Sequence, residues 1–556
     1  MHATNQKLSI SDYLITQLKE HGVSQVFGIP GDYILSFYSK LAKSSIKVIN
    51  TCDEQGAGFA ADAYARLNGL GVVCVTYNAG GLKLVNTTAQ AYAEEVPVLV
   101  IAGAPGWVER QKYPLLHHKV KDYEDQLKIF EHITIASTTI RDPEEAFNEI
   151  NRVIGEIETQ KRPGFIELPR DMVNVIPKNQ SSSRATYASK SASVPQEPLS
   201  SVASKAIDVI NSASQPVIVA GVEVARYGLE NSVVEFAKKA NIPIVSTFLG
   251  KSAVAETNPL YLGIYAGIVA NEAVRQYVES SDCVILVGVL LTDIDLGSNT
   301  ANLDSNKMLT INSDSSTINN RSFPVGLDLL RELTKNQLSR HDRSHAPPSL
   351  KERTPEFEAK KQRIKAKRLF EAIGSFVDKD TVVIADIGDS VCGCLEVPTQ
   401  APRRFLSPTY YSSLGFSIPA SIGVQAKHPE LRPLVVIGDG GFQMTGIEIS
   451  TAIRNQMNPI VIVLNNNGFG TERPMMDGPF NDVARWNFHE LPKVFNSGQG
   501  FLIRTEKELV KAYEKAKRSS GVSILEVILE PNDISPQLQK LCSHMLGKKQ
   551  TAAQKA

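Results

Sequence analysis

The chain has 556 residues, of which 42% are apolar and 21% are charged, and its formal net charge is zero. This composition is that of a soluble globular protein with room for about three or four domains. The balanced charge gives no reason to expect binding to nucleic acid or to an anionic membrane, and no apolar run approaches the roughly 18 residues of a membrane span.

The N-terminal stretch MHATNQKLSISDYL lacks a basic segment followed by an apolar one, so we predict no secretory signal and a cytoplasmic protein. The six cysteines are scattered and mostly lie inside apolar runs, which predicts reduced, buried thiols. Cys392 and Cys394 form a C-x-C pair with no second Cys or His pair at zinc spacing, so we interpret them as structural.

Short β-branched runs recur along the chain and are bounded by Gly, Pro and Asp. Most are continuous apolar runs without alternation, as expected for strands buried on both faces of a parallel sheet. Helical patterns such as ISDYLITQLKEHG and EKELVKAYEKAKRSSG lie between them, which predicts α/β domains. The predicted strands are residues 72–77, 96–103, 164–169, 216–221, 283–288, 381–386, 433–439, 459–466 and 523–530.

Two stretches interrupt this alternation. Residues 177–199 are rich in Ser and Pro and poor in large apolar side chains, and residues 338–358 are charged and contain proline. We interpret both as interdomain linkers. The predicted fold is therefore α/β, with three doubly wound parallel-sheet domains at residues 1–180, 196–338 and 358–556.

The strongest chemical signal lies near the C-terminus. One predicted strand ends at Gly438-Asp439-Gly440, and the next ends at Asn466 and Gly468. Parallel strands end at the same edge of a sheet, where ligands bind, so Asp439 and Asn466 can converge. Carboxylate, amide and carbonyl oxygens suit Mg²⁺ together with phosphate oxygens. Either motif alone fits an ordinary tight turn, whereas both on consecutive strands favour a site for Mg²⁺ and a diphosphate.

This pair of motifs resembles the signature of enzymes that depend on thiamine diphosphate, and the three predicted domains resemble their pyrimidine-binding, central and diphosphate-binding domains. The resemblance implies that Asp439, Asn466 and the carbonyl of Gly468 hold Mg²⁺, and that Gly438 and Gly440 lie against the cofactor. It also implies a homo-oligomer, a dimer or a tetramer, with active sites at the subunit interface.

The resemblance implies roles for further residues. A Glu at the position of Glu54, in VINTCDEQGAGFAADAYAR, hydrogen-bonds the aminopyrimidine and drives formation of the ylid; taken alone, Glu54 fits an acid in the first turn of a helix. In YYSSLGFSIPASIG, Leu414 matches the apolar side chain that supports the bent cofactor. Ser412 and Thr76 match cofactor-contacting positions, and Asp389 stands where many relatives have Thr.

Two adjacent histidines, His117 and His118, stand in PLLHHKV. Neighbouring side chains do not face each other on a helix or a strand, so we expect the pair to be poorly placed to bind one metal ion. Together with Asp32 in VFGIPGDYIL and Glu472 in NNNGFGTE, the pair resembles the proton-handling set of the pyruvate and indolepyruvate decarboxylase family. Taken singly, Asp32 fits a helix N-cap, Glu472 a solvated turn, and the histidines a polar loop.

The resemblance covers essentially the whole chain. It implies decarboxylation of a 2-oxo acid to an aldehyde and CO₂ through a thiamine diphosphate ylid and an enamine. Asp32 and Glu472 are expected nearest the reacting carbon, and His117 and His118 are expected to relay protons, because histidine has an ordinary pKa of about 6.5.

Substrate size is predicted from two residues beside Glu472. Pyruvate-specific relatives tend to have β-branched apolar residues where this chain has Thr471 and Met475. Thr is smaller than Ile and Met is flexible, so we predict a preference for aromatic, branched or longer aliphatic 2-oxo acids. Asp293 stands where relatives have an Asp close to the substrate channel.

Two other functions fit part of the pattern. An acetolactate synthase-like carboligase would share Glu54 and its Gln-Gly-Ala context, but such synthases generally lack the two histidines and the Glu after the asparagines. A protein that binds thiamine diphosphate without catalysis would have no need of Glu54.

Overall fold

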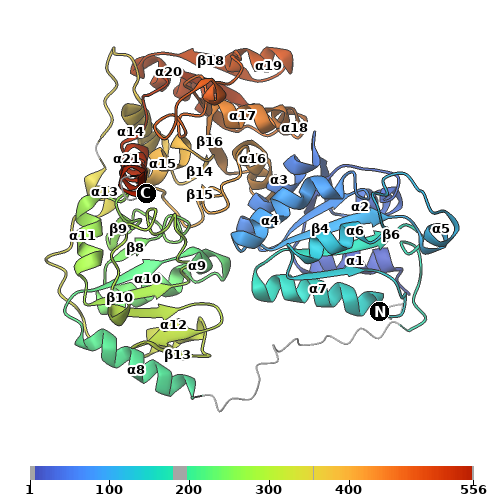
Figure 1. The fold of residues 1–556 in the computed structure, drawn as a ribbon, viewed down its shortest axis with the longest axis horizontal. Coiled ribbons are helices and arrows are strands. Elements are labelled where there is room, and N and C mark those ends of the chain that lie inside the picture. The colour runs from blue at the N-terminus through green and yellow to red at the C-terminus, as the bar shows by residue number, and fades with distance from the viewer. Residues whose placement is uncertain (1–6, 180–196, 355, 554–556) are drawn as a thin grey trace. The chain divides into compact units, whose positions relative to one another are not determined.

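The computed structural model describes residues 7–179, 197–354 and 356–553 (Figure 1). The start of the chain and most of the first predicted linker therefore lie outside the described residues. The chain forms two compact units. The first unit consists of Met1–Lys190, Ile418–Leu431 and Thr445–Met457, and the second consists of Ser191–Ser417, Arg432–Met444 and Asn458–Ala556. The predicted domain boundaries stay predictions.

The first unit contains a six-stranded, entirely parallel sheet in the order β2-β1-β3-β4-β6-β5. Its strands are β1 (Gln25–Gly28), β2 (Lys47–Asn50), β3 (Gly71–Val75), β4 (Val98–Ala104), β5 (Ala136–Thr139) and β6 (Gly164–Pro169). Its helices are α1 (Ile10–Glu20), α2 (Leu35–Lys43), α3 (Glu54–Asn68), α4 (Val85–Ala93), α5 (Trp107–Lys112), α6 (Asp125–Glu131) and α7 (Ala146–Gln160). Helices cover both faces of the sheet (Figure 1).

Three later elements also belong to the first unit: α16 (Ser417–Lys427), the 3₁₀ helix η4 (Gly446–Glu448) and α18 (Ile449–Arg454). Small residues of α3 allow close packing against these later elements. A Cβ atom at Gly56 would lie 2.2 Å from Oε1 of Glu448, so only glycine fits beneath that carboxylate.

The second unit contains two sheets. The central sheet has the order β13-β12-β11-β10-β7-β8-β9. Its strands are β7 (Pro216–Ala220), β8 (Ile244–Ser246), β9 (Tyr261–Ile264), β10 (Cys283–Val287), β11 (Met308–Ile311), β12 (Ser316–Ile318) and β13 (Arg321–Phe323). Its helices are α8 (Leu199–Ser212), α9 (Val222–Arg226), α10 (Glu230–Ala240), α11 (Glu272–Ser280), α12 (Asp328–Lys335) and α13 (Leu350–Arg353).

The central sheet departs from the predicted parallel pattern at one edge, where β12 pairs antiparallel with β11 and with β13. The loop between β12 and β13 is Asn319-Asn320, and both residues have positive φ. Such a two-residue loop reverses the chain directly into a hairpin. The prediction of a linker at 338–358 is wrong in part, because α13 lies within it and Leu338 and Leu350 are buried in the central core.

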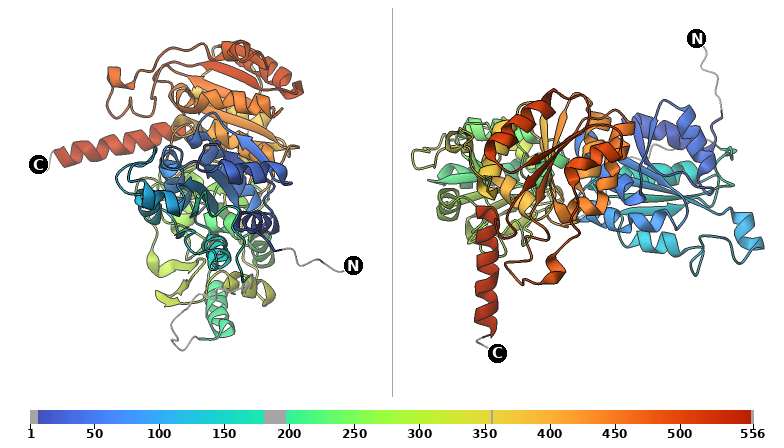
Figure 2. Two further views of the ribbon diagram at one scale, coloured as in Figure 1. Left: turned by 90° about the vertical axis from the view of Figure 1, so that its right-hand side faces the viewer. Right: turned by 90° about the horizontal axis from the view of Figure 1, so that it is seen from above.

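The third sheet is entirely parallel, in the order β15-β14-β16-β17-β19-β18. Its strands are β14 (Thr381–Ala385), β15 (Phe405–Leu406), β16 (Arg432–Gly438), β17 (Ile460–Asn465), β18 (Gln499–Ile503) and β19 (Ser523–Ile528). Its helices are α14 (Ala366–Phe376), α15 (Asp389–Gly393), α17 (Asp439–Thr445), α19 (Leu491–Val494), α20 (Glu506–Arg518) and α21 (Pro536–Ala553). Both views of Figure 2 show α21 projecting away from this sheet.

Each predicted apolar run forms a strand, and the predicted α/β fold class is confirmed. Five cysteines are buried, but Cys52 is exposed because it lies in the turn between β2 and α3. Burial raises the pKa of the Cys392 thiol, and it raises the pKa of Cys394 to about 12, which favours inert thiols. Among the described residues, no helix is both long and apolar enough to cross a bilayer.

Candidate active site

Three predicted site residues of the first unit follow neighbouring strands. Glu54 follows β2, Asp32 follows β1 and Thr76 follows β3, and these strands are adjacent in the order β2-β1-β3. Parallel strands carry their C-terminal ends to one edge of the sheet. The three side chains, which are separated in sequence, therefore gather along that edge.

Glu54 is the first residue of α3 and is 9% exposed. Asp53 caps the helix by accepting a hydrogen bond from the amide of Gln55. Lys83 donates to Oε2 of Glu54 at 3.1 Å and also pairs with Asp53. The side chain is thus mostly shielded from water and has one cationic neighbour. Thr76 is 8% exposed, and its Oγ1 has no hydrogen-bond partner in the described part of the chain, as expected for a contact with an added ligand.

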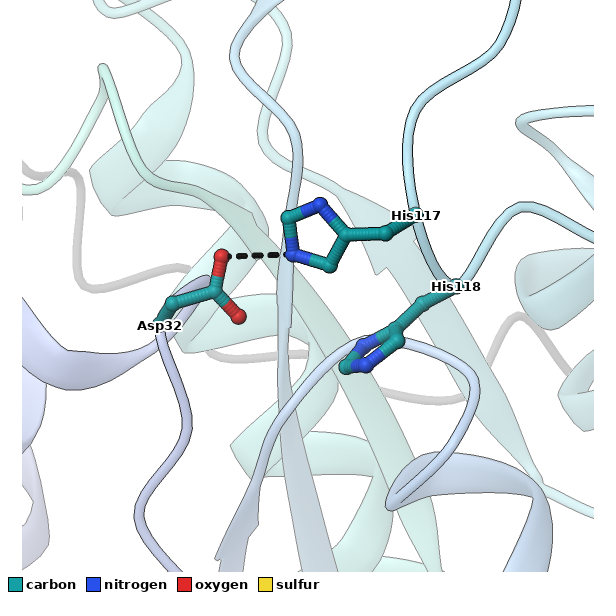
Figure 3. A group of neighbouring side chains, drawn as sticks. All are labelled: Asp32, His117 and His118. Carbon is teal, nitrogen blue, oxygen red and sulfur yellow. Dashed lines mark hydrogen bonds and ion pairs between the residues drawn. The ribbon is translucent and has the colours of Figure 1, made fainter.

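The two histidines lie in the loop after α5 and meet Asp32 (Figure 3). Nε2 of His117 lies 2.8 Å from Oδ2 of Asp32. The rings of His117 and His118 have centroids 4.9 Å apart and planes at 78°. The predicted proton-handling residues of the first unit are therefore in mutual contact.

The expectation that adjacent histidines are poorly placed for one metal ion is wrong for this loop. One potential ligand atom from each of Asp32, His117 and His118 lies within 4.8 Å of the other two. The argument from helices and strands fails because His118 has φ of 67°, in the left-handed region. The backbone turns at that residue and keeps both rings near Asp32.

The predicted site residues of the second unit surround one pocket at the C-terminal ends of β14, β16 and β17, three adjacent strands. The lining includes Leu414, Gly438, Asp439, Gly440, Asn466, Gly468, Thr471 and Glu472. Asp439 is 1% exposed; its Oδ1 accepts a hydrogen bond from the amide of Gly440 and its Oδ2 accepts one from Gly468. Burial raises the pKa of this carboxyl to about 6.

The chemistry of this pocket fits Mg²⁺ and a diphosphate. Asp439 and Asn466 bring a carboxylate and an amide oxygen to the same wall, which are the hard donors that Mg²⁺ prefers. Gly468 has φ of 149°, and a Cβ atom there would lie 2.1 Å from the carbonyl oxygen of Asn481. Only glycine therefore permits this turn, which keeps the backbone of residue 468 beside Asp439.

Three predicted residues do not line this pocket: Ser412, Met475 and Asp293. Ser412 has φ of 63° and its hydroxyl donates to the carbonyl of Thr409. Met475 is half-buried and Asp293 is exposed. Asp389 does line the pocket, and both its carboxylate oxygens accept from the amide of Ser535, at 3.0 and 2.9 Å. Here Asp389 anchors the residue before α21.

Comparisons with known proteins cover almost the whole chain. Family models of thiamine pyrophosphate enzymes match in order, with the N-terminal TPP binding domain at residues 8–129, the central domain at 203–334 and the C-terminal TPP binding domain at 386–527. The chain is 32% identical to indole-3-pyruvate decarboxylase of Azospirillum brasilense, over 96% of this chain and 97% of that protein. The chain belongs to the thiamine diphosphate-dependent 2-oxo acid decarboxylases.

Other relatives of this decarboxylase carry related names. It is 30% identical to alpha-keto-acid decarboxylase of Mycobacterium tuberculosis over 97% of each chain. It is 29% identical to pyruvate decarboxylase 4 of Arabidopsis thaliana, over 96% of this chain and 91% of that protein. The resemblance that the motifs indicate is confirmed at the level of the family.

Several residues that support the site in this decarboxylase carry no recognisable sequence signal. Glu448 of η4 is 1% exposed, and its carboxylate accepts hydrogen bonds from the amides of Cys52 and Asp53 and from the hydroxyl of Thr451. It thereby holds the turn that leads into Glu54. Nothing in GIEI distinguishes this Glu from a solvated helix residue.

Asp386 supports the site in the second unit. Asp386 is fully buried and accepts from the amides of Gly415 and Ser417 and from the Ser417 hydroxyl, which fixes the loop that carries Leu414. Burial raises the pKa of this carboxyl. Its position at the end of the run TVVIAD was a usable signal, because polar residues at strand ends often face the ligand-binding edge.

The loop with Glu472 has its own brace. Arg473 donates to the carbonyl of Asn467 at 3.0 Å, to Asp482 at 2.6 Å and to Asp477 at 2.9 Å. Glu472 itself is exposed. Because Arg473 ties both ends of the loop, Glu472 is presented from a fixed backbone rather than from a free turn.

Proposed function

We propose that this decarboxylase releases CO₂ and a free aldehyde from aromatic, branched or longer aliphatic 2-oxo acids, using thiamine diphosphate and Mg²⁺. The observation that carries the proposal is the gathering of acid and base groups at two sheet edges. Asp32 and Glu54 follow the adjacent strands β1 and β2 of the first unit, and His117 lies in the loop after α5. Asp439 and Glu472 line one pocket of the second unit.

Asp439, Asn466 and the carbonyl of Gly468 would hold Mg²⁺, and Gly438 and Gly440 leave room for the diphosphate. When bound, thiamine diphosphate would supply a carbanionic nucleophile and an electron sink for the decarboxylation. Lys83 contacts Oε2 of Glu54, and this carboxyl group would hydrogen-bond the pyrimidine ring. Leu414 would support the cofactor from the pocket wall.

The remaining residues handle protons and orient the substrate. His117 exchanges a proton at Nε2 with Oδ2 of Asp32, 2.8 Å away. His118 lies edge-on to His117 and extends this relay. Glu472, on its braced loop, protonates the carbon that CO₂ has left. General acid–base groups of this kind contribute about 10²–10⁴-fold to a rate.

Substrate size is supported by the residues beside Glu472. Thr471 lines the pocket, and its Oγ1 would lie 2.8 Å from a Cβ atom at Gly388 on the opposite loop. Ile at this position carries one non-hydrogen atom more than Thr or Val, and it would fill pocket space that Thr471 leaves open. Met475 is half-buried nearby in sequence and can adopt several rotamers.

The proposed assembly is a homo-oligomer, a dimer or a dimer of dimers, in which the first unit of one chain and the second unit of another share an active site. The proposed assembly rests on the resemblance to the family. A cytoplasmic location also stays a prediction.

The test is an assay of the chain with thiamine diphosphate, Mg²⁺ and a panel of 2-oxo acids, in which aldehyde release is coupled to an alcohol dehydrogenase. We expect free aldehyde and a higher kcat/KM for phenylpyruvate than for pyruvate. CO₂ release with only a condensation product would refute the decarboxylase in favour of a carboligase. The Glu54→Gln variant is the control and should lose about 10²–10⁴-fold in kcat.

A further inference from the structure

The cluster of Asp32, His117 and His118 has the composition of a metal site that differs from the Mg²⁺ site. One potential ligand atom of each residue lies within 4.8 Å of the others, and Figure 3 shows both rings on the same side of the loop as the carboxylate. Nδ1 of His118 is buried and has no hydrogen-bond partner within the described residues. In the tautomer that leaves the lone pair of Nδ1 free, this nitrogen can bind a cation.

The surroundings of His117 resemble those of a metal-binding histidine. The Tyr33 hydroxyl lies 3.2 Å from Nδ1 of His117 and donates to the carbonyl of the same residue at 3.2 Å. In the tautomer of His117 that carries its hydrogen on Nδ1, the Tyr33 oxygen accepts from Nδ1–H. In that tautomer the lone pair of Nε2 faces Asp32 Oδ2 at 2.8 Å, and a cation can take the place of the proton that otherwise joins the two atoms. Outer oxygen partners orient metal-binding imidazoles in this way.

His118 is also held before any ligand arrives. The Asn78 side chain donates to the carbonyl of His118 at 2.7 Å, which holds the main chain that carries this ring. Tyr33 stacks on the His117 ring with centroids 4.7 Å apart. The His117 ring and the main chain of His118 are therefore held by neighbours that are not ligands, which reduces the entropy that binding must offset.

We propose that Asp32, His117 and His118 bind one borderline-soft divalent cation such as Zn²⁺, and that this cation inhibits the enzyme. Two imidazole nitrogens and one carboxylate oxygen form the three-ligand set typical of Zn²⁺, with the fourth position open. Mg²⁺ prefers oxygen donors, so saturating Mg²⁺ does not compete effectively for this site.

Binding of the cation requires the side chains to adjust, since their ligand atoms lie within 4.8 Å of one another rather than at the spacing around a single ion. Zn²⁺ bonds of about 2.0–2.2 Å place ligand atoms somewhat farther apart than the present 2.8 Å between Asp32 and His117. Their side chains are 45% and 58% exposed, so both can move and an ion can enter from solvent. Arg170 opposes binding, since its Nη1 lies 3.8 Å from the same carboxylate, but its shorter contact is with Glu109.

Binding of the cation is independent of the proposed function, whereas inhibition rests on it. A metal-bound imidazole can neither accept nor donate a proton at the coordinated nitrogen. If His117 and His118 relay protons, Zn²⁺ stops that relay and lowers kcat while thiamine diphosphate stays bound.

The test is calorimetric titration of Zn²⁺ into the holoenzyme with saturating Mg²⁺ and thiamine diphosphate, together with visible absorption of bound Co²⁺. We expect one ion per chain in the wild type. Tyr33→Phe, which removes only the outer oxygen, should weaken binding by about 10–100-fold, and His117→Ala or His118→Ala by more. The matched control is His132→Ala, which removes an exposed histidine of the same unit and should change nothing.

Unchanged affinity in both His117→Ala and His118→Ala, with their folding verified by circular dichroism, would overturn the site. So would the absence of any bound ion in the wild type. Stoichiometric binding that leaves aldehyde release unaffected would overturn the inhibition. An enzyme that releases no aldehyde with any 2-oxo acid refutes the proposed function but leaves the binding titration decisive for the metal site.

Discussion

The carboxylate of Glu448 accepts a hydrogen bond from the amide of Asp53 at 3.0 Å, across 395 positions in the sequence. It also accepts from the amide of Cys52. These bonds hold the turn between β2 and α3, and the next residue is Glu54. The orientation of the proposed catalytic acid thus depends on a side chain from a distant part of the chain.

We expect Glu448→Ala to lower kcat by up to about 100-fold, because it removes the oxygens that accept from the amides of Cys52 and Asp53, and a small displacement of Glu54 is costly. The measurement is aldehyde release under saturating substrate and cofactor. Thr451→Val is the matched control: it removes the hydroxyl that donates to Glu448 but keeps both amide contacts, and should cost far less. Equal kcat in Glu448→Ala and the wild type would remove the positioning role.

A mixed oligomer tests whether two chains share each active site. Glu54→Gln and Asp439→Asn should each be inactive alone. If the first unit of one chain works with the second unit of its partner, a mixed dimer of the two variants contains one site with both lesions and one intact site. Co-expression with two affinity tags should therefore restore aldehyde release. A mixed dimer as inactive as either parent contradicts the shared site.

Thr471→Ile tests the proposed substrate pocket. The larger side chain should reduce kcat/KM for phenylpyruvate relative to pyruvate by about 10–200-fold, the range for a change of one methylene-sized group in a pocket. Thr471→Val, of nearly the same volume as Thr, should leave the ratio close to that of the wild type. If Ile leaves the ratio unchanged, Thr471 does not limit substrate size.

The buried carboxyl group of Asp389 should make the stability of the folded protein depend on pH. Burial raises its pKa to about 6, above the usual value of a carboxyl in an unfolded chain. The folded state therefore binds a proton more readily than the unfolded state, so its contribution to stability is greatest in acid and is lost as pH rises through about 6. Relative to Asp389→Asn, the Tm of the wild type should rise as pH falls from 7 to 5. A Tm difference that is constant with pH would contradict this.

The ion pair of Lys251 and Glu256 is fully buried, and Lys251 also donates to the carbonyls of Leu395 and Val397. Glu256→Gln leaves this ammonium group without its counter-charge, and we expect a loss of about 3–5 kcal/mol in the free energy of unfolding. Replacing both residues, with Lys251→Met and Glu256→Leu, should cost less. Chemical denaturation of the three proteins measures the difference; equal losses in the single and double variants would contradict the argument.

Much of the architecture could be predicted from local pattern. Continuous β-branched runs such as 460–465 have no polar face, so they can only be strands buried on both sides of a sheet. The motifs at Asp439 and Asn466 end consecutive strands, and parallel strands meet at one edge. The antiparallel hairpin of the central sheet was not predicted from the sequence. The residues on either side of Asn319-Asn320 do not alternate between apolar and polar clearly enough to indicate two paired strands.

The sequence by itself determined the strands, the family and the residue types at the strand ends, because periodicity, turn chemistry and motif spacing are local properties of the chain. Only the tertiary structure decided which strands are neighbours, and hence that His117 lies 2.8 Å from Asp32 across 85 positions. It also decided that His118 turns its ring toward the same carboxylate, since a left-handed residue is stabilised by surrounding contacts and not by its own preference. Contacts such as that of Glu448 with Asp53 arise from the packing of whole elements, which no local pattern encodes.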